Sequence, residues 1–394
     1  TGSINFMIIG FCMGVCSGFA IPVAQRFGAG DYHALRKYVA NSVWLSAIFA
    51  GVMTVVVCVL CRQILLWMRT PQDIFDGAYS YIFVIFVGIP VTYLYNLLSG
   101  IIRSLGDSRS PLIFLVFSSL LNIALDLLLI LSFHLGVAGA AYATVISQAV
   151  SGVLCLIYMR KKFEVLKMTK EEWRMERGYM LHLCNMGIPM GLQYSITAIG
   201  SVILQTAVNT LGSTAVASVT AGSKVGMFFA CPFDAMGATM TTYAGQNVGA
   251  GKVDRVGRGM KACCIIGAVY SAAAFVVLYF FGEQVSLLFV DAAEQEILHN
   301  SWLFLTINAA FYLLLALVNI VRFTIQGMGF SYLAILAGVC EMAARSVIGI
   351  FFVPLIGYKA ACFASPMAWL CADLFLIPAF MYASKTLKRR LQDQ

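Results

Sequence analysis

Eleven long apolar stretches divide this sequence, and they constrain its fold more than any other feature. They cover approximately residues 4–26, 38–60, 79–102, 110–133, 137–159, 187–209, 217–246, 258–281, 300–326, 331–355 and 359–383. Each is long enough to cross a hydrocarbon core about 30 Å thick as an α-helix. Only 11% of the residues are charged, whereas soluble domains carry about 25%. We therefore predict an all-α integral membrane protein.

The Lys and Arg residues gather in or beside every second loop between these stretches. Twenty of the 26 basic residues lie on that side. Because loops rich in Lys and Arg stay in the cytoplasm, we predict a multi-pass membrane protein with a cytoplasmic C-terminus. These loops also account for the net charge of +8, so the basic balance does not indicate nucleic-acid binding.

A short motif occurs twice, at equivalent places in two halves of the chain. Gln25-Arg26-Phe27-Gly28-Ala29-Gly30 returns 221 residues later as Gln246-Asn247-Val248-Gly249-Ala250-Gly251. A second pair of turns, around Gly106 and Gly329, has an offset of 223 residues. We expect a positive φ or a close backbone approach at these two glycines. All four turns fall on the cytoplasmic side, which predicts parallel repeats like those of many transporters.

The repeat also predicts how the chain is divided. We expect an N-lobe over residues 1–159, a cytoplasmic linker over 160–180 and a C-lobe over 181–394. The linker is basic and amphipathic, so we expect its basic face to lie on anionic lipid headgroups. The stretch 187–209 has no counterpart in the first half. We therefore expect eleven helices here, from a protein of twelve whose first helix is missing from this sequence.

Asn122 and Asp126 are the leading candidates for a functional site. Spaced four apart, they share one face of a helix, with Asp126 near the middle of its apolar stretch. A carboxylate there must be protonated, paired or bound to a cation. With the hydroxyl of Thr144 on the next stretch, Asp126 and Asn122 could bind Na⁺ as a metal ion or share a proton. The alternative is a structural hydrogen bond between helices.

A second set of polar residues marks a possible site in the C-lobe. They are Gln193, Lys224, Asp234, Glu341, Arg345 and Asp373. Glu341 stands four residues before Arg345, an order that favours an ion pair within one helix. That pair could be purely structural, or Glu341 could take a cation or proton when Arg345 pairs elsewhere. We further expect Lys224 to act as a gate or to pair with Glu341.

Two other observations bear on these sites. Arg322 lies near the cytoplasmic end of its stretch, where we expect its guanidinium to extend to the interface. The sequence contains no Walker A motif, His-Glu-x-x-His motif or Gly-x-Ser-x-Gly elbow. An enzyme is therefore not expected, and any pumping would use an ion gradient, with Na⁺ or H⁺ as the coupling ion and no other cofactor.

Four segments give the chain a family resemblance. Ala221-Gly222-Ser223-Lys224-Val225, the Gln246 to Lys252 segment, Glu341-Met342-Ala343-Ala344-Arg345 and Ala364-Ser365-Pro366-Met367-Ala368-Trp369 resemble a multidrug and toxic compound extrusion (MATE) transporter of the kind common in Firmicutes. The resemblance implies two six-helix lobes in a bacterial cytoplasmic membrane. It also implies export of organic cations and other amphiphiles in exchange for Na⁺ or H⁺.

The resemblance also ranks the candidate sites. In members with an N-lobe site, an Asn-x-x-x-Asp pair takes part with a Thr on the next helix and an aspartate on the first helix. Asn122, Asp126 and Thr144 match the part present here, and the first-helix position would lie in the missing segment. Members with a C-lobe site carry acids on helices that correspond to 187–209 and 300–326, which contain none here. The resemblance therefore favours the N-lobe site.

The function we expect is secondary active efflux of small amphiphilic or cationic molecules by a monomer in contact with membrane lipids. A lipid-linked oligosaccharide flippase of the same superfamily is an alternative, but it would need a cluster of cationic residues in its cavity. A membrane receptor that transports nothing is a second alternative.

Overall fold

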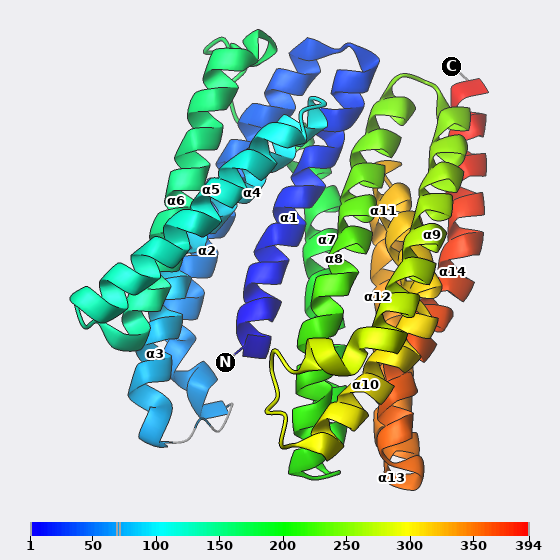
Figure 1. Cartoon of the computed structure of the whole chain (residues 1–394). Helices are drawn as coiled ribbons and strands as arrows, with labels where there is room; N and C mark the ends of the chain where they lie inside the picture. The colour runs from blue at the N-terminus through cyan, green and yellow to red at the C-terminus, as the bar shows by residue number, and fades with distance from the viewer. Residues whose placement is uncertain (1, 68–69, 71, 393–394) are drawn as a thin grey trace. The chain divides into compact units, whose positions relative to one another are not determined.

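The structure, a computed structural model, describes residues 2–67, 70 and 72–392, and its regular structure over these residues is helical throughout (Figure 1). Nine helices in this part of the chain are long and apolar enough to cross a membrane, or eleven if each of two bent pairs is one span. Every predicted apolar stretch lies inside one of these helices or pairs, to within a residue, and most of the helices extend several residues further. The multi-pass helical fold is therefore confirmed. The predicted helix preceding residue 1 lies outside this chain and stays a prediction.

The contacts of the chain divide it into two compact units, one ending at Ser195 and the other beginning at Ile196. The predicted lobe limits at 159 and 181 stay predictions. The first unit contains α1 (Gly2–Ala29), α2 (Tyr32–Trp67), α3 (Gln72–Val87), α4 (Ile89–Ser104), α5 (Arg109–Leu127), the π-helical η1 (Leu128–Ser132), α6 (Gly136–Lys162), η2 (Glu164–Leu166) and the first part of α7 (Arg177–Asn209).

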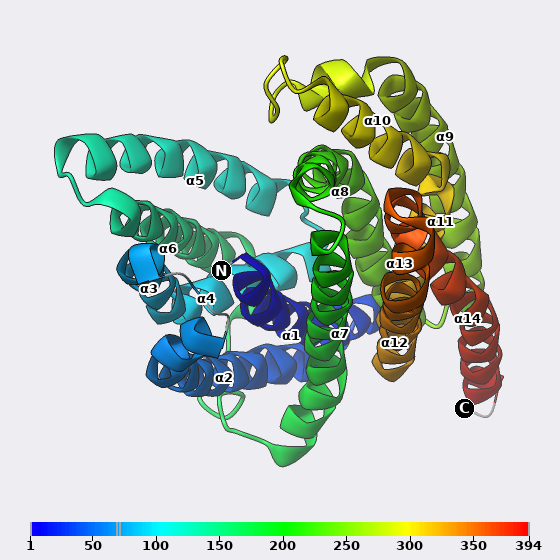
Figure 2. The same cartoon turned by 90° about the horizontal axis from the view of Figure 1, so that it is seen from below.

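In the first unit, α4 is the central helix. It packs against α1, α2 and α6, and α5 lies along the far side of α6 (Figure 2). Buried side chains of α1, α2, α3, α4 and α6 form one apolar core, which includes Phe19, Phe86 and Ile101. Only 6% of the residues in the most apolar segment of α5 and η1 are buried. This helix, which forms a hairpin with α6, is therefore the peripheral helix of the unit.

The second unit contains the rest of α7, followed by α8 (Ser213–Gly249), α9 (Val253–Ser286), α10 (Gln295–Ala310), α11 (Tyr312–Gly327), α12 (Ser331–Val347), the π-helical η3 (Ile348–Phe352), α13 (Val353–Ile356) and α14 (Tyr358–Gln392). Here α11 is central, because it packs against α8, α9, α12 and α14. Its residues from Val318 to Gly327 are all buried.

The two units share backbone features at the repeat offset. Helix breaks of 45° between α3 and α4 and of 51° between α10 and α11 occur at Gly88 and Phe311. The π-helical segments η1 and η3 begin 220 residues apart. Gly106 and Gly329 have φ values of +92° and +94°, which confirms the predicted glycine conformation. The break at Phe311 was not predicted, because no proline marks it.

The linker packs on α2 and contains little helix. Outside the ends of α6 and α7 its regular structure is the short η2. The buried carboxylate of Glu172 accepts hydrogen bonds from Arg36 Nε at 2.7 Å and from the Thr169 amide at 2.9 Å. Trp44 Nε1 donates to the Trp173 carbonyl at 2.9 Å. These contacts hold the linker against the first unit. Binding of its basic face to lipid headgroups stays a prediction.

Gly14 provides a test of the packing between α1 and α7. A Cβ added there would lie 2.6 Å from the Met190 carbonyl oxygen and 2.8 Å from Gly191 Cα. Because backbone atoms cannot move aside easily, we expect Gly14→Ala to lower stability by about 1–3 kcal/mol. Thermal unfolding in detergent measures this change. In the control Gly51→Ala the new Cβ meets nothing within 4 Å, so equal losses in both variants would contradict the packing argument.

A second prediction concerns Asp107, in the turn between α4 and α5. Burial disfavours its ionised form, but hydrogen bonds from Tyr158 Oη at 2.6 Å, from Ser110 and from the Arg109 amide outweigh burial and lower its pKa from 3.8 to about 2. Its contribution to stability is therefore present above about pH 4 and lost as pH falls through 2. We expect Tyr158→Phe to be less stable than the wild type near neutral pH.

Unfolding of both proteins should be measured from pH 6 down to pH 2. The gap between wild type and Tyr158→Phe should shrink across the lower part of this range, because both carboxyl groups become protonated. A gap that does not change with pH would show that Tyr158 acts only through packing.

Candidate functional site

Two polar hydrogen bonds determine how α5 and α6 face each other. Ser118 Oγ donates to the Ser147 carbonyl at 2.6 Å, and Ser151 Oγ donates to the Phe114 carbonyl at 3.0 Å. The two helices are therefore antiparallel, and the face of α5 that carries Ser118 is turned toward α6.

Asn122 and Asp126 continue this face, because they follow Ser118 by one and two helical turns. In the antiparallel register, Asn122 lies opposite the turn of α6 that contains Thr144. Asn122 Nδ2 and Asp126 Oδ1 are buried and make no hydrogen bond to any residue that the structure describes. Buried polar atoms are normally satisfied, so this pair is a candidate for an ion or proton.

Thr144 contributes a hydroxyl group whose proton already makes a hydrogen bond. Its Oγ1 donates to the Ala140 carbonyl of its own helix at 3.0 Å, which leaves the oxygen lone pairs able to accept a hydrogen bond or a cation. Carboxylate, amide and hydroxyl oxygens are the ligands that hard cations prefer. The donor set of Asp126, Asn122 and Thr144 therefore fits Na⁺ in chemistry, and it fits a shared proton equally well.

The structure adds a polar contact that the sequence analysis missed. One turn after Thr144, Gln148 Oε1 accepts a hydrogen bond from the buried Thr92 Oγ1 of α4 at 3.0 Å. Asn96 Nδ2 in turn donates to the Thr92 carbonyl at 2.8 Å. These residues extend the polar side of α6 toward α4. Their polarity within apolar stretches was a usable signal, but their pairing depends on the packing of α4 against α6.

In the second unit, Arg322 lies at the centre of a buried charge cluster. Its side chain is 5% exposed and forms an ion pair with Glu341 of α12. Arg345 lies one turn from Glu341, and its Nη2 is 3.5 Å from Glu341 Oε2. The prediction that Arg322 extends to the interface is wrong, because α11 is surrounded by helices and Glu341 lies directly across from the guanidinium. The Glu341–Arg345 pair within α12 forms, but Arg322 is the nearer partner of Glu341.

Two predicted acids lie near this cluster, Asp234 as an exposed residue and Asp373 as a buried one. Asp234 Oδ1 on α8 accepts a hydrogen bond from Asn319 Nδ2 of α11 at 3.3 Å, and its charge interacts with that of Arg322. Asp373 on α14 is buried, and both of its carboxyl oxygens lack a hydrogen-bond partner among the described residues. Its charge interacts with those of Arg322 and Glu341.

The buried part of the cluster contains two bases and two acids. The bases are Arg322 and Arg345, and the acids are Glu341 and Asp373, with Asp234 exposed beside them. Asp373 differs from the other three, because a buried carboxylate whose oxygens accept no hydrogen bond from the described residues is costly when it is ionised. A proton or a monovalent cation would neutralise it. The cluster can therefore bind a charge as well as hold helices together.

Two residues predicted for the C-lobe site are placed elsewhere. Gln193 is buried in the part of α7 that belongs to the first unit. Lys224 is exposed, and its Nζ lies 5.4 Å from the centre of the Phe289 ring. Together with Asp291 and Glu294 it lines a cavity of about 380 Å³. The expected pairing of Lys224 with Glu341 is therefore wrong, since the cations beside Glu341 are Arg322 and Arg345.

Comparison with known proteins gives consistent matches. The family model MatE matches residues 1–128 and 189–356. The chain is 27% identical over 331 residues to "Probable multidrug resistance protein YoeA" of Bacillus subtilis, covering 82% of this chain and 71% of that protein. It is 25% identical over 320 residues to "Probable multidrug resistance protein NorM" of Thermotoga maritima, covering 79% of this chain and 68% of that protein.

A solved structure described as the outward-facing conformation of a multidrug resistance MATE family transporter has the same fold. It superposes with a TM-score of 0.90 at 21% sequence identity, covering 98% of this chain and 86% of that one. At this identity the likeness concerns the fold alone.

The C-lobe cluster can be tested through stability. We expect Arg322→Met to lower the free energy of unfolding by about 3–5 kcal/mol, because it leaves Glu341 buried beside its weaker partner. Arg345→Met should cost less, since Glu341 keeps its ion pair with Arg322. Chemical or thermal unfolding in detergent measures both variants. The reverse order would show that Arg345, and not Arg322, is the main counter-charge of Glu341.

Proposed function

Since the chain belongs to the MatE family, we propose that it is a secondary active multidrug efflux antiporter. It exports organic cations and other amphiphiles in exchange for Na⁺ or H⁺. The multidrug names of its relatives support this proposal, and so does the multi-pass helical fold. The substrates are small molecules, the working unit is a monomer, and the C-terminus is cytoplasmic, as the basic loops indicate.

The observation that carries the proposal is the environment of Asp126. It is the only acidic residue between Arg109 and Lys162, and its buried Oδ1 has no hydrogen-bond partner among the described residues. A carboxylate within a membrane is expensive unless it binds a proton or cation. Asn122 and Thr144 supply the additional oxygens that such a cation needs.

Coupling requires that Asp126 bind its ion with different affinities in the outward- and inward-facing conformations. A ligand shifts a conformational equilibrium only by its difference in affinity for the two states. Loading of Asp126 then favours one conformation, and release of the ion favours the other. Binding of a cationic substrate in the unloaded state completes the exchange.

The C-lobe cluster is a second location where an ion could couple, with Asp373 as its most buried acid outside the Glu341 ion pairs. The family's acid positions in the C-lobe are not matched on 187–209 and 300–326, so we assign coupling to Asp126. The guanidinium groups of Arg322 and Arg345 are both engaged by Glu341. They therefore do not form the free cationic surface that a lipid-linked oligosaccharide flippase would need.

Transport by purified protein in liposomes tests the proposal. When a Na⁺ or H⁺ gradient is imposed across the liposome membrane, a fluorescent organic cation should be transported against its own concentration gradient. The imposed gradient that drives this transport identifies the coupling ion. We expect Asp126→Asn to abolish this ion-driven transport, because the amide cannot ionise. The variant should still unfold at nearly the wild-type temperature, since Asp126 has no ion pair to lose.

Two further variants make this result specific. Asp76→Asn removes an exposed acid at the start of α3 and should transport normally. Asp373→Asn should leave ion-driven transport in place. Normal transport by Asp126→Asn together with its loss in Asp373→Asn would move the coupling site to the C-lobe. Equilibration without gradient-driven accumulation would indicate a channel, and no movement of the cation would favour a receptor.

A further inference from the structure

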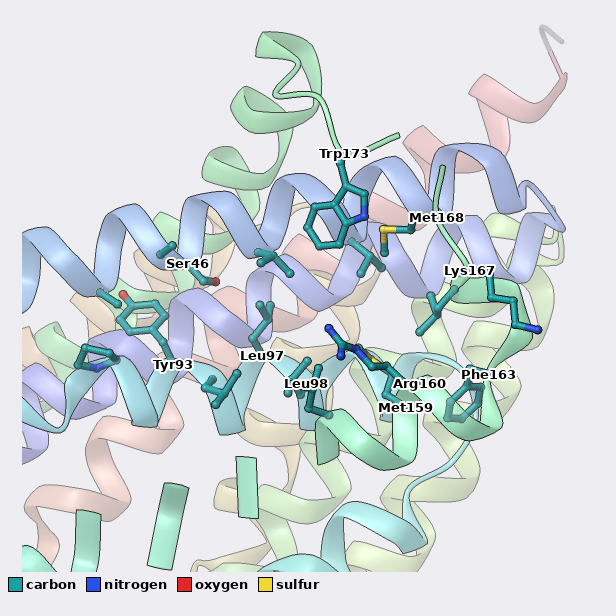
Figure 3. Close-up of a pocket in the computed structure, with 18 of the residues that line it drawn as sticks. Ser46, Tyr93, Leu97, Leu98, Met159, Arg160, Phe163, Lys167, Met168 and Trp173 are labelled. Carbon is teal, nitrogen blue, oxygen red and sulfur yellow. The ribbon is translucent and has the colours of Figure 1, made fainter. Parts of the chain in front are cut away.

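A groove in the first unit is not used by the proposed transport site. It has a volume of about 710 Å³ and lies between α2, α4, α6 and the linker (Figure 3). Its walls are mostly aliphatic, with Val43, Leu97 and Leu156 among them. This volume is within the range of about 300–1,000 Å³ that is usual for small-molecule sites.

The groove is as deep as one leaflet of a bilayer. It follows α2 from Val39 to Gly51, a length of about 18 Å at 1.5 Å per residue. One leaflet of a hydrocarbon core about 30 Å thick is slightly shorter. The hydroxyl-bearing residues Ser46 and Tyr93 lie toward its deep end, and the linker lies at the other end (Figure 3).

The linker end of the groove is basic. Arg160, in the last turn of α6, lines it and points toward Leu98 in Figure 3. Its guanidinium has no ion pair among the residues that the structure describes. Lys167 also lines this end, and the two side chains of its ion pair with Glu164, which are 3.1 Å apart, are 73% and 83% exposed. Exposed pairs of this kind are weak, so Lys167 can serve another anion.

The nearby acid Glu172 does not neutralise these cations. Its carboxylate is occupied by Arg36, by His33 and by the Thr169 amide. The same contacts hold Trp173 and Met168 of the linker over the end of the groove. Tryptophan is enriched where the membrane meets water, which places this basic end at headgroup depth on the side of the basic loops.

We propose that the groove binds one anionic phospholipid of the cytoplasmic leaflet. An acyl chain lies along Val43, Leu97 and Leu156, and the phosphate lies between Arg160 and Lys167. A long apolar channel that ends at Arg160, which has no ion pair among the described residues, and at the weakly paired Lys167 matches an amphiphile with one anionic end. It does not suit an organic cation, which Arg160 would repel. The bound lipid joins the linker to α2, α4 and α6 independently of the transport site.

Native mass spectrometry of the purified protein tests this proposal. Protein from which bound lipid has been removed by washing in detergent is titrated with phosphatidylglycerol and with phosphatidylcholine that carries the same acyl chains. We expect one phosphatidylglycerol to bind in preference. Arg160→Gln should weaken it about fivefold, as expected for one interfacial charge. Gly51→Leu should weaken it about tenfold by excluding roughly two methylene groups from the deep end. A Cβ at Gly51 meets nothing within 4 Å, so this variant should fold.

Each variant has a matched control. Lys161→Gln removes the neighbouring exposed charge, which does not line the groove, and Gly77→Leu adds the same side chain to an open position on α3. Both should bind as the wild type does. Equal binding of the two lipids, equal effects of Arg160→Gln and Lys161→Gln, or no effect of Gly51→Leu would each overturn the proposal. An organic cation that displaces the lipid and binds Arg160→Gln more tightly would identify the groove as a substrate site instead.

Discussion

Backbone hydrogen bonding in an apolar environment is the constraint on which this structure depends. Hydrocarbon offers no partner for a free amide or carbonyl group, so each span must satisfy its backbone internally as a helix. The eleven predicted stretches and the observed helices agree for this reason. A polar side chain has no partner of this kind supplied by the helix geometry itself. A polar side chain within these helices therefore either finds a partner across the bundle or marks a place where something else binds.

The two units treat buried charge differently. In the second unit, Arg322 and Arg345 meet Glu341, and Asp234 meets Asn319, so most of the charge is compensated across helices. In the first unit, Asp126 has no ion pair among the residues that the structure describes, and its buried Oδ1 has no hydrogen-bond partner there. A self-compensated cluster can stabilise packing, whereas a lone carboxylate is suited to binding and releasing an ion.

The repeat explains why the difference lies in side chains and not in backbone. Both units break a helix at an equivalent place. In both, a pair of polar residues four apart precedes a π-helical segment, η1 after Asp126 and η3 after Arg345. π-Helical turns are often found at functional sites. The shared backbone geometry has thus been kept in both halves, while the residues it presents have become Asn and Asp in one and Glu and Arg in the other.

The helical membrane fold, the approximate spans, the internal repeat of sequence and the candidate acids could all be predicted from the sequence. These follow from local properties: apolar length, charge in loops and spacing on one helix face. Only the tertiary structure decided which charges meet. Arg322 lies near the end of an apolar stretch and could have reached water, yet it is buried beside Glu341, because α11 is enclosed by four helices. Lys224 and Gln193 were predicted to belong to the same site, but Lys224 lies beside Phe289 and Gln193 belongs to the first unit. The groove beside Arg160 also could not be predicted from the sequence, since its walls come from α2, α4, α6 and the linker. Contacts between distant segments depend on how helices pack, and helical periodicity within one segment carries no information about that packing.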